Sequence, residues 1–192
     1  MKSFLLCNLL VLLVATSCKK DANQLVKSGD SSATVSTLAG STSGYADGQG
    51  TLAKFAVPHG ISVDMSGNIY VADNNNQRIR KITPSGTVTT FAGSTLGNTN
   101  GTGANAQFNY PEGLAGDATG NIYVVDSENH SIRKITPDGI VSTFTGINIF
   151  AGHLDGSLST ARFNNPTSIT LTNQGVFYIT DNFNFRIRKI SK

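Results

Sequence analysis

Three residues of different chemistry occupy one position of a repeated segment, directly after a proline: His59, Glu112 and Thr167. The frame of the segment is constant while this position varies, which makes these residues the sharpest candidates for a site. Histidine and glutamate can bind a ligand or, where they converge at about 2.0–2.2 Å, a metal. We expect exposed ligand-binding side chains here, with a metal site as the alternative, and we predict no cofactor.

Two tyrosines add to the candidate binding residues. Tyr45 and Tyr110 lie in long polar segments between apolar runs. Loops on a rigid scaffold commonly carry recognition. Aromatic and amide side chains in such loops suit a carbohydrate or a peptide.

Other polar residues recur in every repeat, and repetition favours a structural role because an active site needs asymmetric residues in distinct roles. The recurring pairs are Asp73 with Asn76, Asp126 with Asn129, and Asp181 with Asn184. We expect them to hold local turns, and we expect Arg78 and Arg186 to form charge-assisted bonds to a loop carboxylate. Asp126→Ala should therefore lower stability.

Acid–glycine segments such as 47–50 and 155–157 resemble parts of calcium loops, but calcium needs six to eight oxygen ligands. The sequence supplies too few carboxylates there, so turn chemistry is the better interpretation. No nucleophile elbow, phosphate-binding glycine loop or Cys/His cluster is present. We therefore assign no catalytic residue.

The elements that must position these residues follow from a long internal repeat. GNIYVADNNNQRIRKI begins at Gly67 and returns in related form at Gly120 and Gly175. A period of this length with short apolar runs indicates stacked supersecondary units. In the first unit we predict strands at 60–64, 68–72, 78–82 and 87–92, joined by glycine turns. Four short antiparallel strands per repeat predict an all-β protein, a β-propeller with four-stranded blades.

The segments P-x-G-I-x-V-D, G-N-I-Y-V-A-D and N-x-R-I-R-K-I resemble the NHL-repeat family of β-propellers, over residues 35–192. The resemblance implies blades of the NHL type, and in that family six blades are common. Related propellers include metal-dependent lyases and lactonases, while some eukaryotic NHL domains bind RNA. Because the fold serves many tasks, it does not by itself define this chain's function.

The sequence encodes three blades, half of a six-bladed ring. The last repeat lacks a fourth strand, whereas Val35–Gly40 has the sequence of a fourth strand with no blade before it. We expect a homodimer in which this segment completes the last blade of the partner and closes the ring. A truncated copy of a longer propeller is the alternative.

The amino terminus predicts export and anchoring. Residues 1–17 form a signal peptide with an apolar core too short to span a bilayer. Ala15-Thr16-Ser17-Cys18 resembles a lipobox, which implies a lipidated Cys18; a plain signal peptide with an incidental cysteine is the alternative. Residues 18–34 would be a flexible tether. The start of the tether resembles lipoproteins of Bacteroidetes, which implies an outer-membrane lipoprotein, facing the periplasm or exposed at the surface.

Composition agrees with a turn-rich β protein, since glycine is frequent, tryptophan is absent and only 14% of residues are charged. The formal net charge is +3, and basic residues are spread over the repeats. Nucleic acid is therefore not an expected partner. We expect a non-enzymatic scaffold that binds a glycan, peptide or protein. The alternative is a metal-dependent lyase or hydrolase with its site in the central channel.

Overall fold

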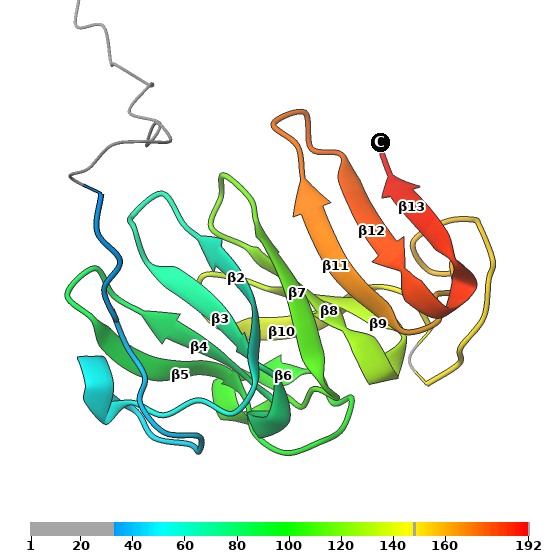
Figure 1. Ribbon diagram of the computed structural model, residues 1–192. Coiled ribbons are helices and arrows are strands. Elements are labelled where there is room, and N and C mark those ends of the chain that lie inside the picture. Colours follow the sequence, from blue (N-terminus) through cyan, green and yellow to red (C-terminus); the bar gives the residue numbers. More distant parts are fainter. Residues whose placement is uncertain (1–32, 148, 192) are drawn as a thin grey trace, which may run out of the picture. The chain divides into compact units, whose positions relative to one another are not determined.

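The computed structural model describes residues 33–147 and 149–191 (Figure 1). The described fold lies in the unit Thr37–Lys192. The expected signal peptide, Cys18 and nearly all of the tether lie outside the described residues. Within the two described ranges, no helix has the length and apolar character to cross a bilayer.

The first sheet has five antiparallel strands in the spatial order β1-β5-β4-β3-β2. Their bounds are β1 Gly48–Gln49, β2 Pro58–Val63, β3 Ile69–Asp73, β4 Arg78–Ile82 and β5 Thr87–Gly93. Strands β2 to β5 are the predicted strands of the first blade, shifted by no more than two residues at either end. The short strand β1 was not expected, and it pairs with the outer edge of β5.

The second sheet repeats this arrangement in the order β6-β10-β9-β8-β7. Its strands are β6 Gly101–Thr102, β7 Pro111–Gly116, β8 Ile122–Asp126, β9 Ser131–Ile135 and β10 Ile140–Thr145. Single 3₁₀ turns connect the second and third main strands of each blade: η2 Asn74–Asn76, η4 Ser127–Asn129 and η5 Asn182–Asn184. Two more, η1 Gly50–Leu52 and η3 Gly103–Asn105, lie in the long loops before the first and second blades.

The third sheet has three strands, in the order β11-β12-β13. They are β11 Pro166–Leu171, β12 Phe177–Asp181 and β13 Arg186–Ile190. The described residues supply no fourth strand to this sheet. The segment expected to be a fourth strand, Val35–Gly40, pairs with no strand in the described part of the chain.

The three sheets stack face to face, with β2, β7 and β11 side by side along one edge (Figure 1). One apolar cluster fills the space between the first and second sheets and includes Tyr70, Ile79 and Leu114. A second cluster, between the second and third sheets, includes Tyr123 and Ile169. The faces that neighbouring sheets turn toward each other are therefore buried, as the repeat predicts.

Candidate functional site

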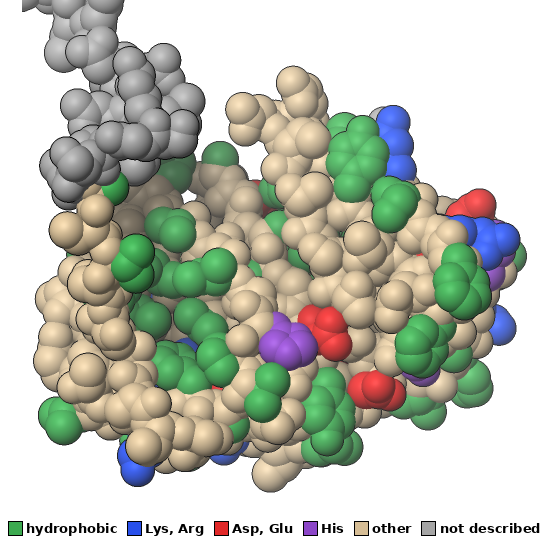
Figure 2. All heavy atoms as spheres, viewed as in Figure 1, with side chains coloured by type: hydrophobic (Ala, Val, Ile, Leu, Met, Phe, Trp, Pro, Cys, Tyr) green, Lys and Arg blue, Asp and Glu red, His purple; other side chains and the backbone are tan. Residues whose placement is uncertain are grey.

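The inner strands β2, β7 and β11 position the variable residue that the sequence singled out. His59, Glu112 and Thr167 are each the second residue of one of these neighbouring strands. The strands approach closely because Gly60 has no side chain: a Cβ there would collide with the backbone carbonyl oxygen of Glu112. His59 and Glu112 are close enough to interact electrostatically. In Figure 2, a histidine lies beside an acidic side chain on the visible face.

Glu112 is a half-buried carboxyl with competing neighbours. Desolvation raises its pKa above the ordinary value, and repulsion by Glu128 adds to this effect. Attraction by His59 and a hydrogen bond from the Ser127 hydroxyl lower the pKa of Glu112 but do not cancel the rise. Strands β2 and β7, with the 3₁₀ turn η4 that carries Glu128, thus bring two acidic residues and one histidine to the same edge of the fold.

Sequence reasoning missed several polar residues at this edge. Asn165 Nδ2 donates to Glu128 Oε1 at 3.0 Å, and the backbone N–H of Asn165 donates to His130 Nδ1 at 3.1 Å. Asn165 Oδ1 is buried and has no hydrogen-bond partner among the described residues, whereas the Ser127 hydroxyl hydrogen-bonds to Glu112. We call His59, Glu112, Ser127, Glu128 and Asn165 the inner-edge cluster.

Glu128 could have been found from the sequence. Asn75, Glu128 and Phe183 share one repeat position that varies as strongly as the position of His59. Its proximity to Glu112 is tertiary, however, because η4 and β7 meet only in the folded sheet. Neither Ser127 nor Asn165 stands out by type or spacing.

The remaining predicted residues do not form one group. Thr167 is half-buried and its hydroxyl lies 2.9 Å from the hydroxyl of Thr180. Tyr110 is 40% exposed, directly precedes β7, and donates its backbone N–H to Gln77 Oε1 of the first blade. Tyr45 lies elsewhere, over the guanidinium groups of Arg78 and Arg80 at 4.2 and 5.0 Å from its ring centroid.

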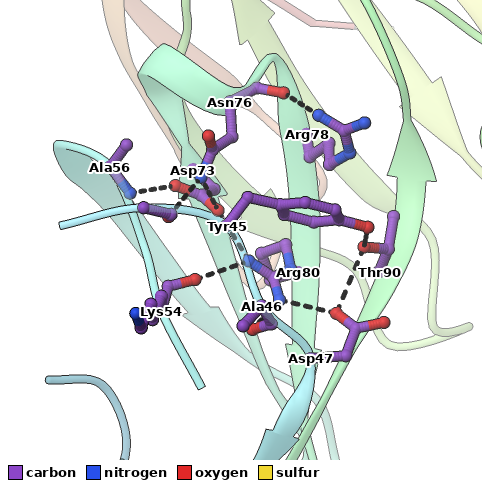
Figure 3. Close-up of polar contacts among 11 residues, drawn as sticks. Tyr45, Ala46, Asp47, Lys54, Ala56, Asp73, Asn76, Arg78, Arg80 and Thr90 are labelled. Carbon is purple, nitrogen blue, oxygen red and sulfur yellow. Dashed lines mark hydrogen bonds and ion pairs between the residues drawn. The ribbon is translucent and has the colours of Figure 1, made fainter. Parts of the chain in front are cut away.

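Arg80 is the centre of the network around Tyr45 (Figure 3). Its guanidinium is fully buried and forms ion pairs with Asp73 at 2.7 Å and with Asp47 at 2.6 Å. It also donates to the carbonyl oxygens of Ala46 and Lys54. Asp47 therefore serves as a partner of an arginine, which agrees with a structural role for segment 47–50.

The prediction for Arg78 and Arg186 was wrong. Each donates to a backbone carbonyl oxygen, that of Asn76 or Asn184, at 2.6 Å. The carboxylate of Asp73 is instead reached by Arg80. Arg78 stands directly opposite Asp73 in the ladder, whereas Arg80 lies two residues further along β4 on the same face. A long side chain spans that diagonal.

The same network recurs in the other blades. Arg133 pairs with Asp126 at 2.8 Å, and Arg188 pairs with Asp181 at 2.7 Å. In each case the carboxylate also accepts from the asparagine three residues later and from a backbone N–H. Desolvation raises the pKa of Asp126, against the opposing effect of Arg133. The recurring aspartates are therefore structural, as their repetition predicted.

The described residues contain no group of three or more His, Cys, Asp and Glu side chains arranged to hold a metal ion. The inner-edge cluster offers carboxylate acceptors, one imidazole and the unpaired buried amide oxygen of Asn165. That chemistry suits a ligand that carries hydrogen-bond donors.

The sheets and the repeated network define NHL-type blades. The NHL repeat model matches residues 55–82 and 108–135 of the chain. The chain therefore contains two segments that match the NHL repeat, and its three sheets have the arrangement of NHL-type β-propeller blades.

Several solved structures from Bacteroides share this fold. A Bacteroides thetaiotaomicron protein of unknown function is 33% identical with a TM-score of 0.63, over 69% of this chain and 34% of that chain. Auxiliary nutrient binding proteins from Bacteroides thetaiotaomicron and Bacteroides ovatus are 30% and 28% identical, with TM-scores of 0.62 and 0.61. Each alignment covers 68% of this chain and 36% of the other.

Curated relatives are much longer than this chain. The chloroplastic protein SUPPRESSOR OF QUENCHING 1 of Arabidopsis thaliana is 32% identical over 71% of this chain and 14% of its own length. Human NHL repeat-containing protein 2 is 28% identical over 71% of this chain and 21% of its own length. The chain thus spans about a seventh to a fifth of these relatives.

Proposed function

We propose that the chain is a lipoprotein of the bacterial envelope whose NHL blades bind a small hydroxyl-bearing nutrient, of which a glycan is the best fit, without chemical conversion. The inner-edge cluster is the observation that carries this proposal. Similarity to the two auxiliary nutrient binding proteins of Bacteroides supports it.

The chemistry of the cluster favours a ligand with several O–H or N–H donors. The carboxylates of Glu112 and Glu128 accept hydrogen bonds when ionised. Asn165 Oδ1 is buried without a partner in the described residues, and such an atom costs free energy until a ligand or water satisfies it. Tyr110 offers a partly exposed ring next to β7, against which the apolar face of a sugar can pack.

Binding to a panel of oligosaccharides, measured with the full chain by calorimetry, tests the proposal. Glu112→Gln should weaken the affinity for a bound sugar by at least about tenfold, because a charged acceptor is lost. Asp138→Asn is the matched control, since it removes the same charge from an exposed hairpin turn. The absence of binding, or equal effects of the two substitutions, would contradict the assignment.

Anchoring by lipid is a separate part of the proposal and rests on the sequence Ala15-Thr16-Ser17-Cys18. Cys18→Ala should move the protein from the membrane fraction to the soluble fraction and abolish incorporation of labelled fatty acid. Unchanged fractionation, together with an unlabelled wild-type protein, would refute the anchor and leave the binding site in place.

A further inference from the structure

The outer edge of β13 borders an open groove of about 1050 Å³ in the third blade. The loop at 153–158 forms the far wall, and Phe144, Phe163 and Phe177 line the interior. Arg188 holds Asp155 of that wall as Arg80 holds Asp47 in the first blade. In the first and second sheets the corresponding space is filled by β5 or β10. The groove therefore has the place of a fourth strand.

One segment of the chain has the sequence of that strand. Residues 35–40 read VSTLAG, while β5 contains VTTFAG at 88–93 and the second blade contains VSTFTG at 141–146. The first valine, the third-position threonine and the final glycine are identical in all three copies. In the described residues, the VSTLAG segment pairs with no strand.

The end of this segment already has the backbone and contacts of a fourth strand. Gly40 has φ +97°, close to the +95° of Gly93, a left-handed conformation that favours glycine. Gly40 faces the ring of Phe55 as Gly93 faces the ring of Phe108. Ser41 Oγ donates to Ala53 O at 3.3 Å, and Ser94 Oγ donates to Ala106 O at 3.0 Å.

The two outer faces of the fold expose side chains that are buried between the inner sheets. Ile61 of β2 is 63% exposed, whereas Leu114 and Ile169 at the same repeat position are 7% and 5% exposed. On the other face, Ile187 of β13 is 69% exposed, whereas Ile79 and Ile132 are fully buried. Figure 2 shows apolar side chains gathered over the first sheet.

The side chains exposed on the two outer faces are the same kinds that meet each other between neighbouring sheets. In the apolar clusters between sheets, Leu114 and Ile169 pack against the neighbouring Tyr and Ile pairs, Tyr70 with Ile79 and Tyr123 with Ile132. On the third blade, Tyr178 and Ile187 occupy the repeat positions of Tyr70 and Ile79 and have no neighbouring sheet in the described chain. On the first blade, Ile61 occupies the position of Leu114 and likewise has none. Burial of these apolar side chains on association would stabilise the contact.

We propose that a second copy of this chain docks on these faces and inserts its VSTLAG segment into the groove beside β13. The exchange is reciprocal, so the interface is isologous and has two-fold symmetry. Six blades then form one closed ring, in which each third blade receives its fourth strand from the partner.

The inner blades give the register of the exchanged strand. In the first sheet, Val88 pairs with Ile82, Thr89 with Lys81 and Ala92 with Ile79, and the second sheet has the same register with its bulge at the same place. Transferred to the groove, the pairs are Val35 with Ile190, Ser36 with Lys189, Thr37 with Arg188 and Ala39 with Ile187.

The new interface differs from the internal ones at one residue. Gly60 and Gly113 allow the inner strands to approach closely, whereas Ser168 stands at the same repeat position in β11. The partner's β2 must therefore lie further from β11 than β7 does. The closed ring then has two interfaces between chains, each wider than the interfaces between blades of one chain. The exchanged strands stabilise these two interfaces.

A disulfide between chains tests both the partner and the register. Opposed residues of antiparallel strands have Cα atoms about 4.5–5.5 Å apart, which is within disulfide range. The double variant Ser36→Cys/Lys189→Cys of the full chain should form a covalent dimer under oxidising conditions, and most of the protein should migrate at twice its mass on a non-reducing gel.

Two controls make the result specific. Ser36→Cys/Arg186→Cys displaces one cysteine by three residues, about 10 Å along the strand, and should remain uncrosslinked. Each single variant retains Cys7 and Cys18 and reports any linkage through the native cysteines. Equal crosslinking of both double variants, or none in the first while its circular dichroism matches that of the wild type, would overturn the proposal.

Discussion

Single residues stabilise each blade through a charged pair that is removed from water. Asp126 and Arg133 are both fully buried, and the guanidinium also donates to Thr99 O and Asn100 Oδ1. Arg133 of β9 therefore connects the long loop before the second blade to the end of β8. The charge of Asp126 is compensated by Arg133, Asn129 and a backbone N–H. This geometry explains why aspartate, asparagine and arginine recur at fixed spacing.

Asp126→Ala should lower the free energy of unfolding by about 3–5 kcal/mol, since it leaves a buried guanidinium without its carboxylate. Denaturant unfolding of the full chain measures this. Asp138→Ala, at an exposed turn, should change stability by no more than about 0.5 kcal/mol. Similar values for the two variants would show that the pair is not a structural element.

Two tyrosines give the fold a predictable response to alkali. Desolvation, with the nearby carboxylates of Asp64 and Asp117, raises the pKa of Tyr70 and of Tyr123 to about 12. The unfolded chain ionises these groups near pH 10.0, so the folded state holds more protons in between. Stability should therefore fall as the pH rises from about 10 to about 12.

Tyrosinate absorbance tests this assignment. Of the five tyrosines in the chain, Tyr70 and Tyr123 should ionise in a late phase near pH 12. The variant Tyr70→Phe/Tyr123→Phe should lose that phase. A late phase that persists in the variant would assign it to other tyrosines.

The sequence correctly predicted the role of residues that bond within their own turn. It failed to predict which arginine reaches Asp73, because that contact runs diagonally between strands β3 and β4. Repetition correctly separated Asp126 from the candidate site. It assigned the wrong arginine, because Arg78 and Arg80 lie on the same face of β4 and only the fold shows which one reaches Asp73. The inner-edge cluster was half predicted: His59 and Glu112 vary within a constant frame, while Ser127 and Asn165 join them only through tertiary packing.

At the scale of strands, close approach of β2 and β7 determines the inner edge of the fold. Gly60→Ala places a Cβ against the carbonyl of Glu112, so it should cost about 1–3 kcal/mol of stability and disturb the contact between His59 and Glu112. Gly152→Ala is the matched control, since an added Cβ there would meet only the side chain of Arg162 at 3.4 Å. Equal melting temperatures for the two variants would contradict this packing.

The main strands could be predicted from the sequence because their Ile, Tyr and Val residues and glycine turns repeat three times. Strands β1 and β6 could not, since Gly48–Gln49 and Gly101–Thr102 have neither alternation nor β-branched enrichment. Their pairing is supplied by the long outer strands β5 and β10. Tertiary structure, and not local propensity, makes them strands.

For the whole molecule, stacking explains both the core and its incompleteness. A blade buries its faces only against neighbours, so the first and third blades each leave an apolar face uncovered in the described chain. Closure by a second copy would bring two inner-edge clusters to one central channel. A ligand site built on the inner strands would then occur twice, related by the two-fold axis.

The mass of the full chain in solution, measured by light scattering after gel filtration, tests this account most directly. The wild-type protein should have twice the mass of one chain, which is 20.2 kDa where residues 1–17 are retained. Ile187→Asp should give the single mass, because it places a carboxylate in the proposed interface between chains. Ile140→Asp, at an exposed residue 49% accessible on β10, should remain a dimer. A wild-type protein that is folded and has the mass of one chain at micromolar concentration would contradict the closed ring.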